Sequence, residues 1–188
     1  YPWAKIILWA SLECTNFSKA KGGQSRDADS RTLANSLFRY SYSLNPDYIM
    51  IENVVEFMAW GPLDDEGKPV SMKRGEDFEK WRKHIKKIGY YDQWKTINSA
   101  DLGARTTRDR LFGCFSKPHL NISWPELTHD KKGRYGRKKW KSVRPLLRLE
   151  DRGTSIFNRK KPLVDNTLKR LMSGMKKYHK DSKSIVND

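Results

Sequence analysis

The sequence predicts an α/β fold in which a parallel β-sheet is flanked by helices. Short apolar runs alternate along the chain with amphipathic stretches of helical spacing, and the first apolar runs end in polar residues. Strand, helix and strand in succession imply right-handed crossovers, so the strands are expected to lie parallel. A chain of 188 residues is long enough to form one such domain with a sizeable core.

The first two strands are expected at residues 6–10 and 48–54, with a helix between them. That helix is predicted by apolar residues at roughly helical spacing, by a capping residue before them and by a proline after them. These residues are Leu33, Leu37 and Leu44, then Asp29 or Ser30 as the cap, and Pro46.

The clearest helix is expected around residues 78–88, where four apolar residues recur at intervals of three and four and Gly89 follows as a stop signal. Two further strands are expected at 93–98 and 111–116. A basic helix is expected at 167–180. Its apolar face would hold Leu168, Leu171, Met172 and Met175.

Two segments contain turn residues instead of a regular apolar period. Residues 61–75 form an excursion between the second strand and the second helix, and residues 118–137 form a long surface linker.

Positive charge is concentrated in the second half of the chain. Lys and Arg number 38 against 22 Asp and Glu, which gives a net charge of +16. Residues 1–116 carry 18 basic and 15 acidic side chains, whereas residues 117–188 carry 20 and 7. We therefore expect an α/β core over 1–117 and a basic linker with a helical segment over 118–188, which phosphates would attract. Residues 131–140 interleave cations with aromatics and glycines, which is typical of a phosphate-contacting loop.

Three residue types that can take part in catalysis lie at the ends of apolar strands. Cys14 follows the first strand, Glu52 ends the second, and Arg108 and Arg110 precede the last. Because sites in open α/β sheets form where the carboxyl ends of strands meet, the thiol, the carboxylate and the guanidinium groups are expected to converge in one active site.

The same residues carry a resemblance to the DNA cytosine-5 methyltransferases. That family places its nucleophile in a Pro-Cys-Gln turn followed by Phe-Ser, then a Glu-Asn-Val strand end, then Gln-x-Arg-x-Arg. The counterparts here are ECTNFS at 13–18, ENV at 52–54 and TTRDR at 106–110, in the same order and at fitting spacing. Residues 140–170 resemble the segment that leads toward the family's DNA-reading domain.

The resemblance implies a partial Rossmann-like fold of the S-adenosylmethionine-dependent type and a catalytic role for residues 1–117. Cys14 would add to carbon 6 of a cytosine, Glu52 would stabilise the protonated ring, Arg110 would hold the carbonyl oxygen, and Arg108 would support the loop. The methyl group of S-adenosylmethionine would then pass to carbon 5.

Such chemistry needs the base flipped out of the duplex, so double-stranded DNA is the expected partner. The loop after Cys14 supplies hydroxyl, cationic and flexible groups that could close over DNA. The residues expected to contact DNA are Ser18, Lys19, Lys21, Gln24, Ser25, Arg26, Asn53, Lys138, Lys139 and Lys141.

Two positions depart from the family pattern. Glu13 stands where the family has proline, and Thr106 stands where it has glutamine. A carboxylate beside a thiol raises the thiol pKa unless it points away, so the reactivity of Cys14 is expected to depend on the orientation of Glu13.

The family's glycine-rich cofactor turn does not precede Tyr1, and its target-recognition domain would lie beyond Asp188. The sequence is therefore expected to be the centre of an enzyme whose S-adenosylmethionine site lies largely outside it. A truncation, one half of a split enzyme with a complementing chain, and an incomplete sequence record are all consistent with this. The residues that bind the cofactor stay unassigned.

Two other functions stay open beside a methyltransferase of restriction-modification, phage or orphan type. One is a catalytically inactive, basic DNA-binding remnant, and the other is an RNA cytosine-5 methyltransferase. The intact Cys14, Glu52 and Arg110 disfavour the remnant, whereas nothing in the sequence separates DNA from RNA as the substrate.

The cysteines, histidines and apolar runs bear on the cellular compartment, on metal binding and on membrane insertion. Cys14 and Cys114 form no disulfide framework, so a reducing cytoplasm is expected, and Cys114 is expected to pack in the core. The resemblance implies a bacterial or phage-encoded protein. No zinc-type ligand spacing is present, so no metal is expected. No stretch approaches the roughly 18 apolar residues of a membrane span.

Overall fold

The computed structural model describes residues 3–12, 33–148, 150–151, 155 and 159–178. The chain divides into two compact units, residues 1–144 and residues 145–188, and each is described by itself. The expected division after residue 117 concerns the start of a segment leading toward a recognition domain and stays a prediction.

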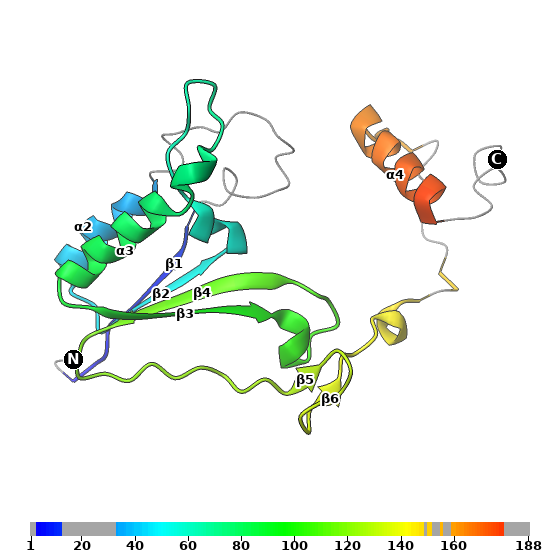
Figure 1. The fold of residues 1–188 in the computed structure, drawn as a ribbon. Helices are drawn as coiled ribbons and strands as arrows, with labels where there is room; N and C mark the ends of the chain where they lie inside the picture. Colours follow the sequence, from blue (N-terminus) through cyan, green and yellow to red (C-terminus); the bar gives the residue numbers. More distant parts are fainter. Residues whose placement is uncertain (1–2, 13–32, 149, 152–154, 156–158, 179–188) are drawn as a thin grey trace. The chain divides into compact units, whose positions relative to one another are not determined.

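A mixed four-stranded sheet forms the centre of the first unit (Figure 1). Its strands are β1 (Ile7–Ser11), β2 (Tyr48–Asn53), β3 (Tyr91–Asn98) and β4 (Asp109–Ser116), in the order β1-β2-β4-β3. All four lie where the sequence predicts strands, and the expected α/β fold is confirmed.

The expectation that every strand runs parallel is wrong for β4. β1 and β2 are parallel, whereas β4 is antiparallel to both β2 and β3. The reason is the connection between β3 and β4, which consists of the 3-10 helix η5 (Ser99–Leu102) and a short turn. A parallel neighbour needs a crossover of about a dozen residues or more, usually with a helix, so this short connection favours an antiparallel return.

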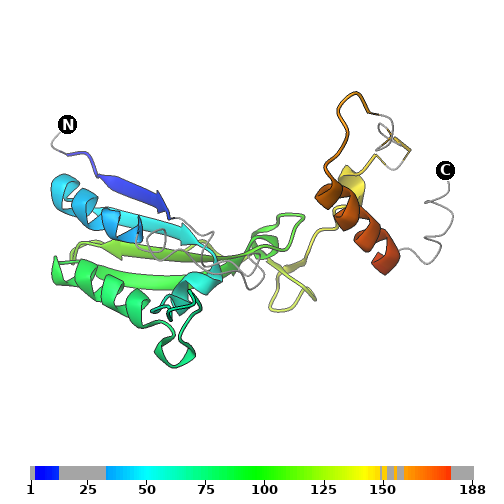
Figure 2. The same ribbon diagram turned by 90° about the horizontal axis from the view of Figure 1, so that it is seen from above.

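Two helices, α2 (Ser36–Leu44) and α3 (Glu76–Lys87), run side by side along one face of the sheet (Figures 1 and 2). α2 is preceded by η2 (Leu33–Asn35) and ends at Asn45 in the left-handed region. α3 ends at Lys87, and the predicted stop signal Gly89 follows two residues later with a φ of 100°. The capping residues expected for the first helix, Asp29 and Ser30, lie outside the described residues.

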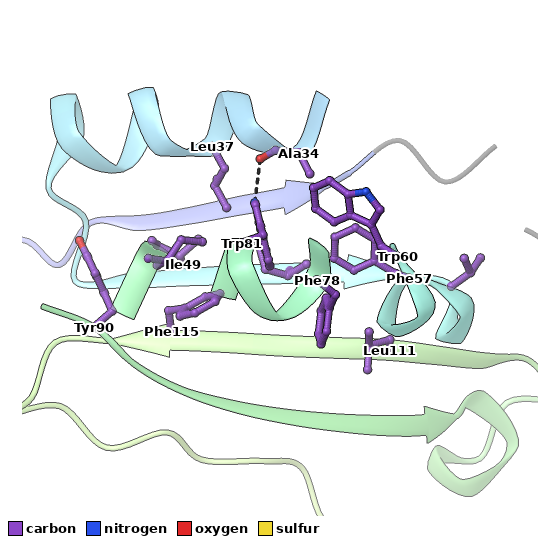
Figure 3. Packing of buried hydrophobic residues seen from close by; sticks show 13 residues of the cluster. Ala34, Leu37, Ile49, Phe57, Trp60, Phe78, Trp81, Tyr90, Leu111 and Phe115 are labelled. Carbon is purple, nitrogen blue, oxygen red and sulfur yellow. Dashed lines mark hydrogen bonds between the residues drawn. The ribbon is translucent and has the colours of Figure 1, made fainter. Parts of the chain in front are cut away.

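Apolar side chains from both helices meet those of β2 and β4 in one core (Figure 3). Because side chains alternate along a strand, every second residue of β2 and β4 faces the helices, including Ile49, Ile51 and Phe115. Trp81 packs at the centre, and its indole N–H donates to the carbonyl of Ala34 over 3.0 Å. This bond joins α3 to η2, directly before α2, and the apolar side chains pack the two helices and the sheet into one body.

The excursion predicted between β2 and α3 is built from short elements. The 3-10 helix η3 (Val55–Ala59) follows β2, a bridge joins Leu63 to Pro69, and η4 (Ser71–Lys73) leads into α3. Asp64 closes the turn, because its Oδ1 accepts the backbone N–H groups of Glu66 and Lys68.

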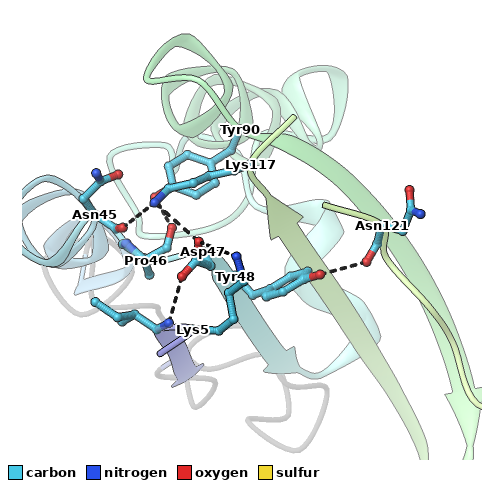
Figure 4. A network of polar contacts seen from close by, with 9 residues as sticks. Lys5, Asn45, Pro46, Asp47, Tyr48, Tyr90, Lys117 and Asn121 are labelled. Atoms are coloured by element: carbon cyan, nitrogen blue, oxygen red, sulfur yellow. Dashed lines mark hydrogen bonds and ion pairs between the residues drawn. The ribbon is translucent and has the colours of Figure 1, made fainter. Parts of the chain in front are cut away.

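A polar network fixes the end of the sheet where β2 begins (Figure 4). Asp47 accepts the backbone N–H of Ile6 over 2.9 Å and lies near Lys117 and Lys5. The Ile6 N–H and the two ammonium groups lower the pKa of Asp47. Tyr90 donates its hydroxyl hydrogen to the carbonyl of Pro46. These contacts hold the amino ends of β1 and β2 against the end of β4, at the edge opposite the carboxyl ends of β1 and β2.

The face of the sheet away from the helices is apolar and partly open. The extended segment 121–125 crosses it, and Trp124 donates to the side-chain oxygen of Gln93 over 2.8 Å. A cavity of about 560 Å³ is lined there by Trp9, Met50, Phe112, Cys114 and Trp124 among others. Trp9, on the edge strand β1, is 57% exposed.

The predicted surface linker contains a second, small sheet. β5 (His129–Asp130) pairs with β6 (Lys138–Lys139), and both belong to the first unit. Periodicity does not reveal strands of two residues, so the sequence predicts only a linker there.

The second unit contains α4 (Asp165–Tyr178), and the 3-10 helix η6 (Arg144–Leu146) lies at its start. The expected basic helix is confirmed, although it begins two residues earlier than predicted and Lys180 lies outside the described residues. No helix in the described part of the chain has the length and apolar character needed to cross a membrane.

Candidate active site and nucleic-acid interface

Glu52 and Arg110 form an ion pair at the carboxyl end of β2. The Nε atom of Arg110 lies 2.9 Å from Oε1 of Glu52, and the two side chains are 20% and 28% exposed. Glu52 lies opposite Phe112 in the β2–β4 ladder, and Arg110 is two residues before Phe112. Both side chains therefore lie on the sheet face away from the helices, which is also the face that Phe112 and the apolar cavity occupy.

Asn53 occupies the opposite face of the same strand. It is 2% exposed, and its Oδ1 accepts the backbone N–H of Val54 over 2.7 Å. Its Nδ2 donates to the carbonyl of Leu12 over 3.4 Å. In this structure the amide ties the end of β2 to the residue after β1, and its expected contact with substrate stays a prediction.

Arg108 lies in a turn that is firmly attached to β3. Its carbonyl accepts the backbone N–H of Ser99, and the hydroxyl of Ser99 donates to the carbonyl of Thr106 over 2.7 Å. Asn98 donates to the carboxylate of Asp109 over 2.9 Å. The Arg108 side chain is exposed, so it is available to a partner at the same edge of the sheet.

The segment that contains the predicted phosphate-contacting run docks on η5. The backbone N–H of Thr128 donates to the carbonyl of Asp101, and the indole N–H of Trp140 donates to the Asp101 carboxylate over 2.8 Å. His129 is buried beneath Gly103, where an added Cβ would approach the imidazole Cε1 to 2.8 Å. We call residues 130–141 the basic loop.

Exposed cations of the basic loop include three that the sequence predicts as DNA contacts: Lys138, Lys139 and Lys141. η5 is bonded on one side to this loop and on the other to the turn before β4. The ion pair and the basic loop are therefore connected through packed structure.

The remaining predicted site residues lie outside the described residues. They are Cys14, Ser18, Lys19, Lys21, Gln24, Ser25 and Arg26.

Cys114 is buried on β4 at 5% exposure, which confirms its predicted burial; its side chain lies on the sheet face away from the helices, where it lines the apolar cavity. Burial also raises the pKa of its thiol. Among the described residues, no group of three or more His, Cys, Asp or Glu side chains is placed to hold a metal ion.

Sequence reasoning missed the anchor of the basic loop. Asp101 lies 39 residues before Trp140, and no local pattern links an aspartate in a 3-10 turn to a distant indole. Asp130 offered a weak signal, because an aspartate three residues before Gly133 is typical of a turn closed by its own side chain.

A carboxylate is paired with a guanidinium at one end of the central strands β2 and β4, and an exposed basic loop is connected to them through η5. Together they define a candidate site that could bind a polar group belonging to a polyanionic molecule. The comparison with known proteins agrees with this assignment. The chain belongs to the C-5 cytosine-specific DNA methylase family, whose model matches residues 6–186. The resemblance inferred from residues 13–18, 52–54 and 106–110 is therefore confirmed at the level of the family.

Two relatives are bacterial type II methyltransferases. M.NgoMIV of Neisseria gonorrhoeae is 34% identical over 126 residues, which cover 64% of this chain and 35% of the relative. M.Sau3AI of Staphylococcus aureus is 32% identical over 87 residues, which cover 46% of this chain and 19% of the relative. The chain thus spans about a third or less of the length of these relatives.

Two solved structures are similar over part of the fold. The Schizosaccharomyces pombe Dnmt2 methyltransferase is 16% identical, with a TM-score of 0.49 over 88% of this chain and 44% of its own. A putative DNA modification methyltransferase encoded within an Escherichia coli prophage is 21% identical, with a TM-score of 0.42 over 62% of this chain and 28% of its own.

Proposed function

We propose that this chain is the central catalytic part of a DNA cytosine-5 methyltransferase that acts on a flipped-out cytosine through a covalent adduct on Cys14. The observation that carries the proposal is the ion pair between Glu52 and Arg110 at the carboxyl end of β2. Ser11 lies opposite Glu52 in the parallel ladder, and the chain continues from Ser11 to Cys14 three residues later. The strand that leads to the thiol therefore ends beside the carboxylate.

In the proposed reaction, the Cys14 thiolate adds to carbon 6 of the cytosine ring. This addition gives carbon 5 enamine character, and Glu52 stabilises the ring protonated at nitrogen 3. Arg110 holds the carbonyl oxygen of the base and, by its ion pair, fixes the direction of the Glu52 carboxylate. S-adenosylmethionine would supply the electrophilic methyl group when bound. Methyl transfer would leave S-adenosylhomocysteine. A solvent water would then take the proton from carbon 5, and the electron pair of that C–H bond would expel Cys14 as the thiolate.

The glycines that follow β2 and β3 do not offer a cradle for the cofactor. A Cβ on Gly61 would collide with the backbone of Lys73, one on Gly75 would meet the carbonyl of Met58, and one on Gly103 would meet His129. The space beside each of these glycines is already filled by other atoms of the chain. These three glycines therefore offer no cradle for the cofactor, and we propose that its binding segment is supplied by other residues of the enzyme.

We expect a protein of these 188 residues to bind S-adenosylmethionine weakly or not at all, because a glycine-rich turn at a helix N-terminus would supply most of the cofactor contacts. Isothermal titration calorimetry measures this directly. Micromolar binding would mean that the cofactor site lies within the chain after all.

The open apolar face gives a physical reason to expect a complementing segment. Parallel strands are usually covered on both faces, yet both helices of the first unit lie on one side of β1 and β2. Trp9 and Met50 face the other side, next to the cavity of about 560 Å³. We propose that the cofactor-binding segment, in the same protein or in a complementing chain, packs against this face.

The basic loop supports DNA as the partner, with its cations on phosphates and the base held by Glu52 and Arg110. The type II names of the two relatives support a restriction-modification role. The need for a reduced thiol at Cys14 supports a cytoplasmic location. The preserved Glu52–Arg110 pair argues against an inactive remnant.

We expect the chain to bind DNA with steep salt dependence and little sequence preference, since interactions with phosphates would dominate. Changing Lys138, Lys139 and Lys141 to glutamate should weaken binding to every duplex tested. The slope of log K against log salt is negative, and its magnitude should decrease by about 0.9 for each phosphate that the variant no longer neutralises. Gel-shift titrations at several salt concentrations measure both effects.

The matched control reverses the same number of exposed charges on the two helices, at Arg39, Lys83 and Lys87. This variant should bind almost as the parent does, because its changes lie on α2 and α3, whereas the basic loop is docked on η5. Equal weakening by both sets would show that only the net charge matters, and the basic loop would lose its assignment.

A further inference from the structure

The basic loop has a conformation that one carboxylate fixes. The guanidinium of Arg134 contacts Asp130 with Nε–Oδ1 and Nη2–Oδ2 distances of 3.3 and 3.4 Å. The backbone N–H groups of Arg134 and Lys132 also donate to Oδ1, over 3.1 and 2.8 Å. The guanidinium and these N–H groups lower the pKa of Asp130 to about 2, so the carboxylate is ionised at neutral pH.

Tyr135 stands at the tip of this loop in an unusual conformation. Its φ is 59°, and it lies between Gly133 and Gly136, whose φ values are 71° and 70°. The left-handed region is costly for a tyrosine, because its Cβ crowds the backbone. Its side chain is nevertheless 79% exposed, so burial in the core does not explain this conformation. Strain of this kind at a surface position is a reason to look for a function.

Two arginines flank the exposed ring. The guanidinium carbons of Arg134 and Arg137 lie 5.6 and 5.9 Å from the centre of the Tyr135 ring. Around them, the run from Lys131 to Lys141 contains seven cations and no acidic residue. Such a surface suits a partner that offers both phosphates and apolar or π surfaces, which is the chemistry of a nucleic acid.

The position of the loop relative to the ion pair is also fixed. Asp101 holds Thr128 and Trp140 at the two ends of the loop, and η5 is bonded to the turn that carries Arg108. Arg105 strengthens this junction through a bond to the carbonyl of Ser142. DNA that presents a base to Glu52 and Arg110 would therefore pass a loop whose shape exists before binding.

We propose that the basic loop is a preformed DNA-contacting element in which Tyr135 makes the non-ionic contact, with a sugar or base, and Asp130 is the positioning residue. This inference rests on the proposed DNA substrate but goes further, because it attributes DNA affinity to the conformation of the basic loop as well as to its charge. In this arrangement Asp130 increases the affinity for DNA although its own charge opposes it.

The decisive variant is Asp130→Asn, measured by fluorescence anisotropy with a labelled duplex and the 188-residue chain. Simple electrostatics predicts tighter binding, because the net charge rises by one. A positioning role predicts binding weaker by about threefold to tenfold, since the amide is a poorer acceptor for the Arg134 and Lys132 donors. Asp64→Asn is the matched control, because Asp64 closes a turn of the same kind and its change to asparagine also raises the net charge by one.

The role of Tyr135 is tested by the salt dependence of DNA binding. A lost ionic contact changes this dependence, whereas a lost non-ionic contact does not. Tyr135→Ala should weaken binding about tenfold with an unchanged slope of log K against log salt, whereas Tyr135→Phe should bind nearly as the parent does. Lys139→Ala should instead reduce the magnitude of this slope by about 0.9.

Tighter or equal binding by Asp130→Asn, together with parental binding by Tyr135→Ala, would overturn the inference and leave the proposed function intact. If the parent chain binds no duplex even at low salt, the inference and the proposed DNA contact of the basic loop fail together. Thermal unfolding of each variant shows that the fold is kept.

Discussion

Replacing Cys14 with serine is expected to abolish covalent trapping of DNA that carries 5-fluorocytosine at the target position. The experiment uses an assembly completed with a cofactor-binding segment and a recognition domain. In the parent assembly the fluorine blocks the final elimination, so the adduct accumulates on the sulfur. A hydroxyl is a far weaker nucleophile than a thiolate at neutral pH, and the rate of trapping should fall by about 10⁴-fold or more.

Cys114→Ser is the control for this experiment, because it removes the other cysteine of the chain. Cys114 is buried on β4, and its thiol contacts the carbonyl of Phe115, so it should not meet a base. Mass spectrometry of the trapped peptide identifies the attached residue. An adduct on Cys114, or none in an assembly that binds both DNA and cofactor, would remove Cys14 from its role as nucleophile.

Glu13 offers a graded test of the same assignment. A carboxylate next to Cys14 in sequence raises the pKa of the thiol if it points toward it, which lowers the fraction of thiolate. Glu13→Pro restores the residue typical of the family, and comparing the pH dependence of trapping in both proteins would show the direction of the Glu13 side chain.

The strands and helices could be predicted because their patterns are local. The apolar positions of α3 recur at helical intervals, and the predicted stop signal Gly89 follows the end of the helix. The direction of β4 could not be read in this way, because it depends on the length and path of the connection through η5. A pattern of apolar residues identifies a strand but does not state which way it runs.

The candidate site was only partly accessible from the sequence. The family pattern brought Glu52 and Arg110 together, and the structure places them 2.9 Å apart. The anchoring of the basic loop depends on single long-range bonds, such as that between Trp140 and Asp101, which have no sequence period. The positive φ of Tyr135 was equally hidden, since tyrosine is not a residue that signals a left-handed turn.

The ion pair predicts that a change at Glu52 affects DNA binding and catalysis to different extents. Removing the Glu52 carboxylate leaves the Arg110 guanidinium, which is only partly exposed, without its partner. The same cation would still attract DNA. Binding of DNA and activation of the base should therefore respond differently to changes at Glu52.

Glu52→Gln is expected to slow covalent trapping by about 10² to 10⁴-fold, the range typical of a lost proton-transferring group, while DNA binding stays unchanged or tightens slightly. The amide keeps the shape of the side chain but cannot stabilise the protonated ring by its charge. Glu66→Gln makes the same charge change on an exposed turn and should leave the rate unaltered.

The double variant Glu52→Gln with Arg110→Gln tests whether the pair works as a unit. If Arg110 acts partly by directing the Glu52 carboxylate, the double variant should lose less rate than the two single variants combined. Single-turnover trapping measures all three rates against the parent assembly. Fully additive effects would show that Arg110 contacts the base independently of Glu52, and parental rates for Glu52→Gln would exclude the carboxylate from activation of the ring.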